Sequence, residues 1–242
     1  MLTAGCLILA VGFTSASAAD RAHLPREEQE KLLRRASNEE LLSGGRASVA
    51  ALGTYQVLLA KRERIAGKLQ ELQLRRLTVR EHPFAVRVVA EAGGTVGRKI
   101  LFDQERDPTH LLVREPGVLG WLGWIQIPAN DPRIFKSTNH PVTDVGFGAM
   151  LRQEAQDLEQ GKPFGGYLRT DEGWNERGRY CIRFDAPPGA GRVYASRCRV
   201  CLDAASWLPL EMTVWDEDGL LETYEFSELL PNVPGGAAAL AP

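Results

Sequence analysis

The sequence predicts an α+β domain built on an antiparallel sheet, and two patterns support this fold class. In residues 54–104 apolar side chains recur at every second position, which is typical of strands that place one face on a core. Short turns join these runs, so neighbouring strands are expected to pair antiparallel, because a parallel pair needs a long crossover. Residues 25–42 and 143–160 have instead the apolar spacing of helices.

Four strands in a meander are expected in residues 54–104. The apolar phase of the first strand consists of Tyr55, Val57, Leu59 and Ile65. Residues 69–79 resume the alternation with a phase slip near Arg75-Arg76, which predicts a β-bulge. Residues 84–90 and 98–102 complete the meander and are joined by a glycine turn.

The segment before the meander is expected to be helical. Pro25 suits the first turn of a helix, and acidic residues follow it. Ser37 is alternatively the cap of a second, short helix. The pair Gly44-Gly45 is expected to end this helical segment.

An apolar run and a helix follow the meander, after a further strand expected at residues 109–114. The run, residues 119–128, contains Trp121 and Trp124, which are expected to pack in the core or at its rim, or to form a mobile flap over an apolar pocket. The helix at 143–160 has an apolar side with Phe147, Met150, Leu151 and Leu158. Its polar side is expected to hold Arg152, Glu154, Asp157 and Glu159.

Strands are expected again in the last third of the chain. The four strands are residues 179–186, 193–202, 208–215 and 220–226. Turns at 187–191 and 216–219 make two hairpins of them, and the second turn carries the strong Asp-Gly signal.

Composition and charge exclude some classes of partner. The chain has 242 residues and a formal net charge of −2, which argues against a dedicated nucleic-acid binder. Charge is uneven, because residues 54–80 are mostly basic and residues 208–228 carry only acidic charges. Complementary strand faces or a docking surface would explain this asymmetry.

The first residues predict export. Residues 1–19 have an apolar run followed by small residues, as in a cleaved signal whose true start lies upstream of Met1. A lipid-anchored Cys6 and an uncleaved anchor are the alternatives, and no membrane-spanning segment is expected after signal removal. The chain then divides into a helical segment (20–46), one domain (47–230) and a disordered tail (231–242).

Three cysteines remain after the signal: Cys181, Cys198 and Cys201. They lie on the two strands of the first late hairpin, so a disulfide from Cys181 to Cys198 or to Cys201 is geometrically reasonable in an oxidising compartment. The Cys198–Cys201 spacing also suits redox chemistry, but that motif works at a helix start. Zinc would need a fourth ligand, so no metal site is expected.

No catalytic signature is present, and neither catalysis nor a cofactor is expected. The sequence lacks a nucleophile elbow, a phosphate loop and a dinucleotide fingerprint. His82 and His140 each precede a proline in a loop, where histidine is most often solvated or a cap.

Several motifs resemble one bacterial family. These are KRERIAGKLQE, HPFAVRVV, GRKILF, NHPVTDVGF and WLPLEMTVWDEDGLLETYEFSEL. In this order they resemble domain of unknown function family 1571, an exported family of bacteria with two membranes, over residues 55–233. The resemblance implies a disulfide, because family members tend to carry cysteine near Cys181 and Cys198, but it implies no activity.

The closing hairpin also resembles that of LolA-type periplasmic lipoprotein carriers. The resemblance rests on Leu208-Pro209-Leu210, on Asp216 to Gly219 and on Tyr224-Glu225-Phe226. It implies a curved antiparallel sheet forming an incomplete half β-barrel, with one or two helices on its concave side.

Two functions are compatible with such a fold. The first is non-catalytic binding of a lipid or acyl chain in the concavity of the sheet, in the periplasm or the cell envelope. Phe147, Met150 and Leu151 are then expected to line the ligand cavity, with Trp121 and Trp124 near its mouth. The alternative is an envelope interaction module that docks a protein partner or a membrane surface without a small ligand.

Overall fold

A single twelve-stranded sheet dominates the structure, a computed structural model that describes residues 17–164, 166–188 and 194–242. The strands are β1 (Thr54–Ile65), β2 (Lys68–Leu69), β3 (Gln73–Arg80), β4 (Ala85–Ala92), β5 (Lys99–Asp103), β6 (His110–Arg114), β7 (Ile125–Pro128), β8 (Leu168–Trp174), β9 (Tyr180–Asp185), β10 (Arg197–Leu202), β11 (Pro209–Asp216) and β12 (Gly219–Leu230). All pairs are antiparallel, in the order β7-β6-β5-β4-β3-β1-β12-β11-β10-β9-β8, and β2 pairs with β1.

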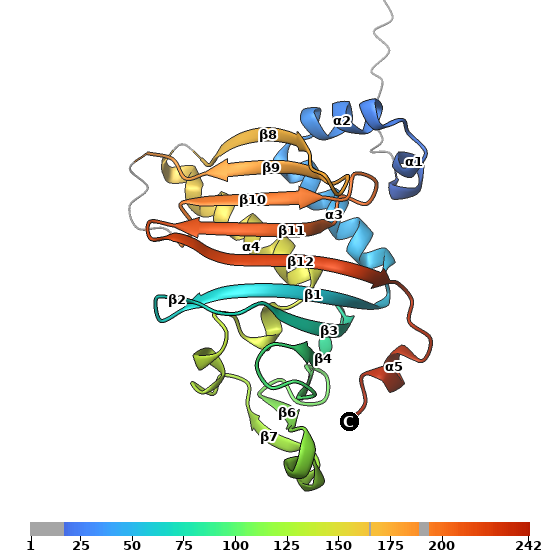
Figure 1. Ribbon diagram of the computed structural model, residues 1–242. Coiled ribbons are helices and arrows are strands. Elements are labelled where there is room, and N and C mark those ends of the chain that lie inside the picture. Colours follow the sequence, from blue (N-terminus) through green and yellow to red (C-terminus); the bar gives the residue numbers. More distant parts are fainter. Residues whose placement is uncertain (1–16, 165, 189–193) are drawn as a thin grey trace, which may run out of the picture.

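The sheet is open, because its outer strands β7 and β8 do not pair with each other within the described residues. It twists along its length, so the strands at the β7 end run at a steep angle to those at the β8 end (Figure 1). The helices α3 (Asn38–Ala51) and α4 (Phe147–Gly161) cross one face of it (Figure 1). The predicted α+β class with an open antiparallel sheet is therefore confirmed.

Strand β1 holds the two halves of the sheet together. It pairs with β3 on one side and with β12, the last strand, on the other. Its residues Tyr55, Val57 and Leu59 are buried, as the alternation predicts. The bulge predicted near Arg75 is confirmed by a register shift between β3 and β4 at Leu74/Arg75.

Ion pairs connect the basic first strands to the acidic last hairpin. Arg64 pairs with Asp216, and Arg76 Nη1 lies 2.6 Å from Glu228 Oε2. These contacts fit the expectation of complementary strand faces in the two oppositely charged segments.

The edge strand β8 was not predicted from the sequence. Its residues alternate in burial, but the sequence LRTDEGW is largely polar, so it lacks the apolar signal of a strand. Arg169 of β8 donates hydrogen bonds to the carbonyl oxygens of Leu33 (2.8 Å) and Ala36 (2.6 Å). Leu33 lies in the last turn of helix α2 (Arg26–Arg35), and Ala36 is the C-cap of this helix. Strand β8 therefore fixes the C-terminal end of α2 to the sheet.

A second helix does follow Ser37, as one of the two alternatives predicts. Ser37 caps α3 through a capping box with Glu40. The helix does not end at Gly44-Gly45, however, and that expectation was wrong. A Cβ on Gly44 would overlap the Trp207 ring, and one on Gly45 would lie 3.1 Å from Leu151. The two glycines let α3 pack closely, and the helix crosses the expected boundary at residues 46/47.

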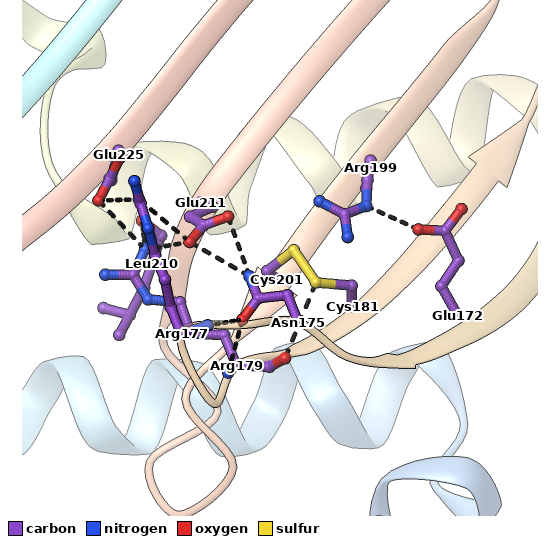
Figure 2. Close-up of a disulfide and its surroundings, with 10 residues drawn as sticks. All are labelled: Glu172, Asn175, Arg177, Arg179, Cys181, Arg199, Cys201, Leu210, Glu211 and Glu225. Carbon is purple, nitrogen blue, oxygen red and sulfur yellow. Dashed lines mark hydrogen bonds and ion pairs between the residues drawn. A yellow bond between two sulfur atoms is a disulfide. The ribbon is translucent and has the colours of Figure 1, made fainter.

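A disulfide joins Cys181 of β9 to Cys201 of β10, and Cys198 carries a free thiol. The two bridged residues are direct cross-strand partners (Figure 2). This selects one of the two pairings that the sequence left open. Part of the predicted turn at 187–191 lies outside the described residues. The other turn is confirmed, because Asp216 pairs with Gly219, whose φ is +105°.

The two ends of the chain differ in how far they are described. Residues 1–16, which include most of the expected signal and Cys6, lie outside the described part, and α1 (Ala18–Ala22) begins immediately after it. The tail that is expected to be disordered contains α5 (Gly236–Ala239), and the apolar side chain of Leu240 that follows it is buried, with 4% exposed. No described helix is long and apolar enough to cross a membrane.

Candidate functional site

A cavity lies between the two helices and the β8 end of the sheet. Its volume is about 60 Å³. Helices α3 and α4 line one side of it, and β9 and β10 line the other. The lining residues are Asn38, Leu41, Leu42, Leu151, Glu154, Asp157, Leu158, Tyr167, Ile182, Phe184, Ala195, Cys198, Val200, Leu202 and Trp207. The set is mostly apolar, with its ionisable groups on α4, on β10 and at Tyr167.

One of the three expected helix residues lines this cavity. Leu151 does so, whereas Phe147 and Met150 lie in the core outside it. The Phe147 ring centroid is 5.4 Å from that of Tyr55 and 4.7 Å from that of Phe226, so the space around it is filled. The first turn of α4 is therefore core.

The two expected tryptophans lie away from the cavity, close to the other end of the sheet. Trp121 belongs to the 3₁₀ helix η1 (Gly117–Leu122), and Trp124 directly precedes β7. Trp121 is 77% exposed and Trp124 is half-buried. Since the cavity is lined by β9 and β10, the structure does not bring the tryptophans to its mouth.

The N-terminal end of α4 is held by a buried hydrogen-bond network. The Tyr55 hydroxyl donates to Glu81 Oε1 (2.7 Å) and accepts from the Phe147 amide (3.0 Å). The Gly148 amide also donates to Glu81 Oε1 (3.1 Å), so Tyr55 and Glu81 each satisfy one of the free amides at this helix end. A Cβ on Gly148 would overlap Glu81. Burial, and then the charge and hydrogen bond of Glu81, raise the pKa of Tyr55 well above its usual value.

Glu154, two turns further along α4, faces the cavity and has no such partners. The residue as a whole is half-buried, but its Oε1 atom is fully enclosed and makes no hydrogen bond. Burial raises the pKa of Glu154 to about 8, and the nearby Asp157 adds to the rise. The carboxyl group is therefore mostly protonated at neutral pH.

Other polar groups around the cavity are also withdrawn from water. Burial raises the pKa of Asp157, although a hydrogen bond from Gln153 and the charge of His140 oppose the rise. Burial raises the pKa of the Cys198 thiol well above its usual value. Trp207 Nε1 is enclosed without a hydrogen-bond partner, like Glu154 Oε1. Two residues of the lining thus carry polar atoms that nothing in the described chain satisfies.

A second polar cluster lies where β1 meets β12. Glu63 and Glu222 are directly opposed across the two strands and are 3% and 1% exposed. Two like charges in such positions repel each other, so they need compensation. Lys61 Nζ lies 2.7 Å from Glu63, and His140 Nε2 lies 3.1 Å from Glu222. Tyr194 donates to Glu222 (2.6 Å).

The charges in this cluster shift its pKa values in opposite directions. Burial lowers the pKa of His140, but the hydrogen bond and charge of Glu222 outweigh it, and the pKa is raised. Burial raises the pKa of Glu222, but the hydrogen bond and charge of His140 outweigh it, and the pKa is lowered. Both shifts favour the charged forms of His140, which is a quarter exposed, and of Glu222, which is buried.

The same cluster offers a possible set of metal ligands. One ligand atom each of Glu63, His140 and Glu222 lies within 4.8 Å of the others, a donor set that suits a divalent cation. A metal ion there would compete with Lys61 for Glu63 and with the His140 proton for Glu222. The internal cations already compensate both carboxylates.

Sequence reasoning missed these acidic residues although a signal was present. Glu63 follows Tyr55, Val57 and Leu59 in the same, core-facing phase of β1. A charge in an apolar phase is the sign of a buried polar site. Glu154 was expected on the polar side of α4, but seven residues after Phe147 it lies in the middle of the apolar stripe. Its assignment to the polar side was wrong.

Comparison with known sequences finds one family. The family described as "Protein of unknown function (DUF1571)" matches residues 52–239. No curated protein matches the sequence.

Several solved structures resemble this fold at low identity. The complex of MucA and MucB from Pseudomonas aeruginosa contains a chain with 14% identity and a TM-score of 0.49, covering 86% of this chain and 61% of that one. The lipoprotein LppX from Mycobacterium tuberculosis has 16% identity and a TM-score of 0.42, with 80% and 96% covered. A LolA superfamily protein from Nitrosomonas europaea has 12% identity and a TM-score of 0.38, with 86% and 98% covered. Likenesses of this degree assign no function.

Proposed function

The chain belongs to the family described as protein of unknown function DUF1571, and we propose that it is a non-catalytic binding protein for a hydrophobic ligand. The ligand occupies the space between α3, α4 and the β9–β10 hairpin. The observation that carries the proposal is the cavity at this place, whose lining is mostly apolar. Pockets for small molecules are typically lined in this way, with a few polar groups that orient the ligand.

A ligand of lipid size requires the cavity to widen. Its volume of about 60 Å³ compares with about 300–1,000 Å³ for pockets of drug-sized ligands. We expect the C-terminal half of α4 to be the part that moves. Among the described residues, no hydrogen bond or ion pair of a side chain links residues 153–161 to the sheet; the two polar contacts there are Gln153–Asp157 and Glu159–Lys162, both within the helix region.

An exported, periplasmic or envelope location fits this proposal. The signal-like residues 1–19 support it, and so does the disulfide Cys181–Cys201, because such bonds persist in oxidising compartments. Lipid attachment at Cys6 is the alternative mode of retention.

Binding of Nile red, a neutral apolar dye, tests the proposal. We expect saturable binding with a blue shift of the dye emission. Ala195→Phe fills the cavity and should abolish binding, whereas Ala50→Phe, on the exposed face of α3, should not change it. Leu158→Phe provides a second filling variant at a half-buried position if Ala195→Phe unfolds the domain. Absent binding, or binding unaffected by both filling variants, would refute the proposal.

A second candidate function rests on the other end of the sheet. Exposed apolar side chains gather on η1 and the start of β7; they are Val118 (85% exposed), Leu119 (58%), Trp121 (77%), Leu122 (50%) and Ile125 (41%). Residues 116–128 contain no charged residue, and tryptophan with aliphatic side chains suits the boundary between lipid headgroups and acyl chains. The occupant favoured by this composition is a membrane surface, as in the envelope interaction module.

Vesicle flotation distinguishes this candidate from the first. Wild-type protein should float with phospholipid vesicles, and Trp121→Ser should weaken flotation without changing Nile red binding. Protein that stays in the bottom fraction of the gradient with every vesicle composition would exclude membrane docking by η1.

A further inference from the structure

Glu154 occupies the position in α4 where an apolar side chain is expected. Helical spacing places it on the same side as Leu151 and Leu158, and all three line the cavity. Its Oε1 atom is enclosed and has no hydrogen-bond partner. An enclosed carboxyl oxygen without a hydrogen-bond partner destabilises the fold, because it has lost its contact with water and no protein group replaces it. A ligand that supplies the missing partner would recover this loss.

The charges around Glu154 restrict what that partner can be. No lysine, arginine or histidine is among the described residues that line the cavity. The titratable groups that share the cavity with Glu154 are Asp157 on the same helix, Cys198 on β10 and Tyr167 before β8. Carboxyl, thiol and phenol groups carry no positive charge, and burial raises the pKa of all three, which favours their neutral forms. The other charged neighbours act from outside the lining: His140 on Asp157, and Glu222 on Cys198.

This acidic surrounding disfavours an anionic head group. A carboxylate or phosphate would lie near Asp157 with no cation in the described lining to balance it, and a buried unpaired charge is costly. A group that donates hydrogen bonds and carries positive charge would instead satisfy Glu154 Oε1 and interact favourably with both acidic residues.

We propose, on the basis of the proposed function, that the ligand of this cavity is a hydrophobic amine. Its hydrocarbon part lies against the apolar lining, and its ammonium group donates a hydrogen bond to Glu154. Binding of the ammonium form converts Glu154 from the carboxylic acid to the carboxylate, so that one proton leaves the site for each ligand bound below about pH 8.

Displacement of Nile red by three compounds of equal chain length tests the ligand class. Decylamine, decanol and decanoate differ only in the head group. We expect decylamine to bind about tenfold or more tightly than decanol, as for a hydrogen bond between charged groups, and decanoate to bind most weakly. Decylamine affinity should rise with pH between 6 and 8, while decanol affinity should stay constant.

Two variants of the same helix assign the effect to Glu154. Glu154→Gln should remove the preference for decylamine over decanol and its pH dependence. Glu159→Gln, at an exposed position of α4, should retain both. Retained Nile red binding in both variants shows that the cavity is intact.

The outcomes separate this inference from the proposed function. Equal affinity for the three compounds, tighter binding of decanoate, or an amine preference that survives Glu154→Gln would overturn the amine assignment while the apolar site remains. Failure of Nile red to bind wild-type protein would overturn the proposed function, and with it this inference.

Discussion

Two carboxyl groups packed along α4 have opposite surroundings: Glu81 lies beside the N-terminal end of the helix, and Glu154 belongs to its C-terminal half. At the N-terminal end, Glu81 accepts hydrogen bonds from Tyr55 and from the Gly148 amide. In the C-terminal half, Glu154 faces an apolar cavity and its enclosed oxygen has no partner. Glu81, the residue after β3, fixes the helix through hydrogen bonds with Tyr55 of β1 and with the Gly148 amide. Glu154 gives the helix no such attachment.

The difference indicates which part of the helix serves the fold and which part is available for a ligand. Phe147 stacks on Tyr55 and packs at a tilt against Phe226, and Glu81 accepts hydrogen bonds beside it. This end resists movement, because displacing it would strand several buried polar groups. Around Glu154 a cavity of about 60 Å³ remains and the enclosed oxygen has no partner, so movement there would break no side-chain hydrogen bond of Glu154 among the described residues.

The largest expected effect comes from replacing the satisfied carboxylate. Glu81→Leu leaves the Gly148 amide and the Tyr55 hydroxyl without their acceptor, and should lower the free energy of unfolding by about 3–5 kcal/mol. Urea unfolding followed by circular dichroism measures the change. A loss below about 1 kcal/mol would mean that the network does not hold the helix.

The sheet wall of the cavity is expected to depend on the disulfide. The bridge spans a sequence separation of 20 residues, and a loop of this size should stabilise the folded state by about 3 kcal/mol. The double variant Cys181→Ala/Cys201→Ala should therefore melt at a lower temperature. A thiol count on a protein of residues 17–242, purified without reductant and then unfolded, should give one free cysteine, Cys198. A count of three would contradict the bridge.

Replacing Glu154 by leucine should change the free energy of unfolding in the opposite direction from Glu81→Leu. Glu154→Leu removes an unsatisfied polar group from an apolar cavity and should stabilise the protein by about 1–2 kcal/mol. It should also change the pH dependence of stability. Because the folded pKa of Glu154 is raised from 4.5 to about 8, wild-type protein loses stability as pH rises through this interval, and the variant lacks that contribution. Destabilisation by Glu154→Leu at pH 8 would contradict the described environment.

A smaller effect is expected in the loop that leads into α4. The pKa of His140 is raised, so the stabilisation from its pair with Glu222 is complete below pH 6.5 and is lost as pH rises through the folded pKa. His140→Asn should cost about 0.5 kcal/mol at pH 6 and less at pH 9, because the His140 ring is a quarter exposed and Glu222 keeps its hydrogen bonds from Asn139 and Tyr194. Nuclear magnetic resonance titration of the ring should give a pKa above 6.5.

The sequence predicts the parts of this molecule that depend on local pattern. The alternation of Tyr55, Val57 and Leu59 locates β1, and the Asp-Gly turn at Gly219 locates the last hairpin. Strand β8 escapes prediction because a polar edge strand lacks an apolar phase. The sequence does not show that α3 packs closely against Trp207. The pair Gly44-Gly45 permits this packing, but without knowledge of the packing partner it resembles a helix end.

The candidate site is less predictable, because it depends on which elements meet. Helical spacing predicts that Leu151 lies on the apolar side of α4, where it lines the cavity. The position of Trp121 depends instead on the strand order, which places β7 and β9 far apart in the sheet. The choice of Cys201 over Cys198 follows from the register of β9 and β10. Glu154 was assigned by its residue type, whereas its angular position in α4 indicates the apolar side.

Hydrogen exchange along α4, with and without Nile red, tests most directly whether the C-terminal half of this helix opens to admit a ligand. We expect the amides of residues 153–161 to exchange faster than those of residues 149–152, and bound dye to slow the exchange of residues 153–161 selectively. Equal protection of the two halves that does not change while the dye is bound would contradict this expectation.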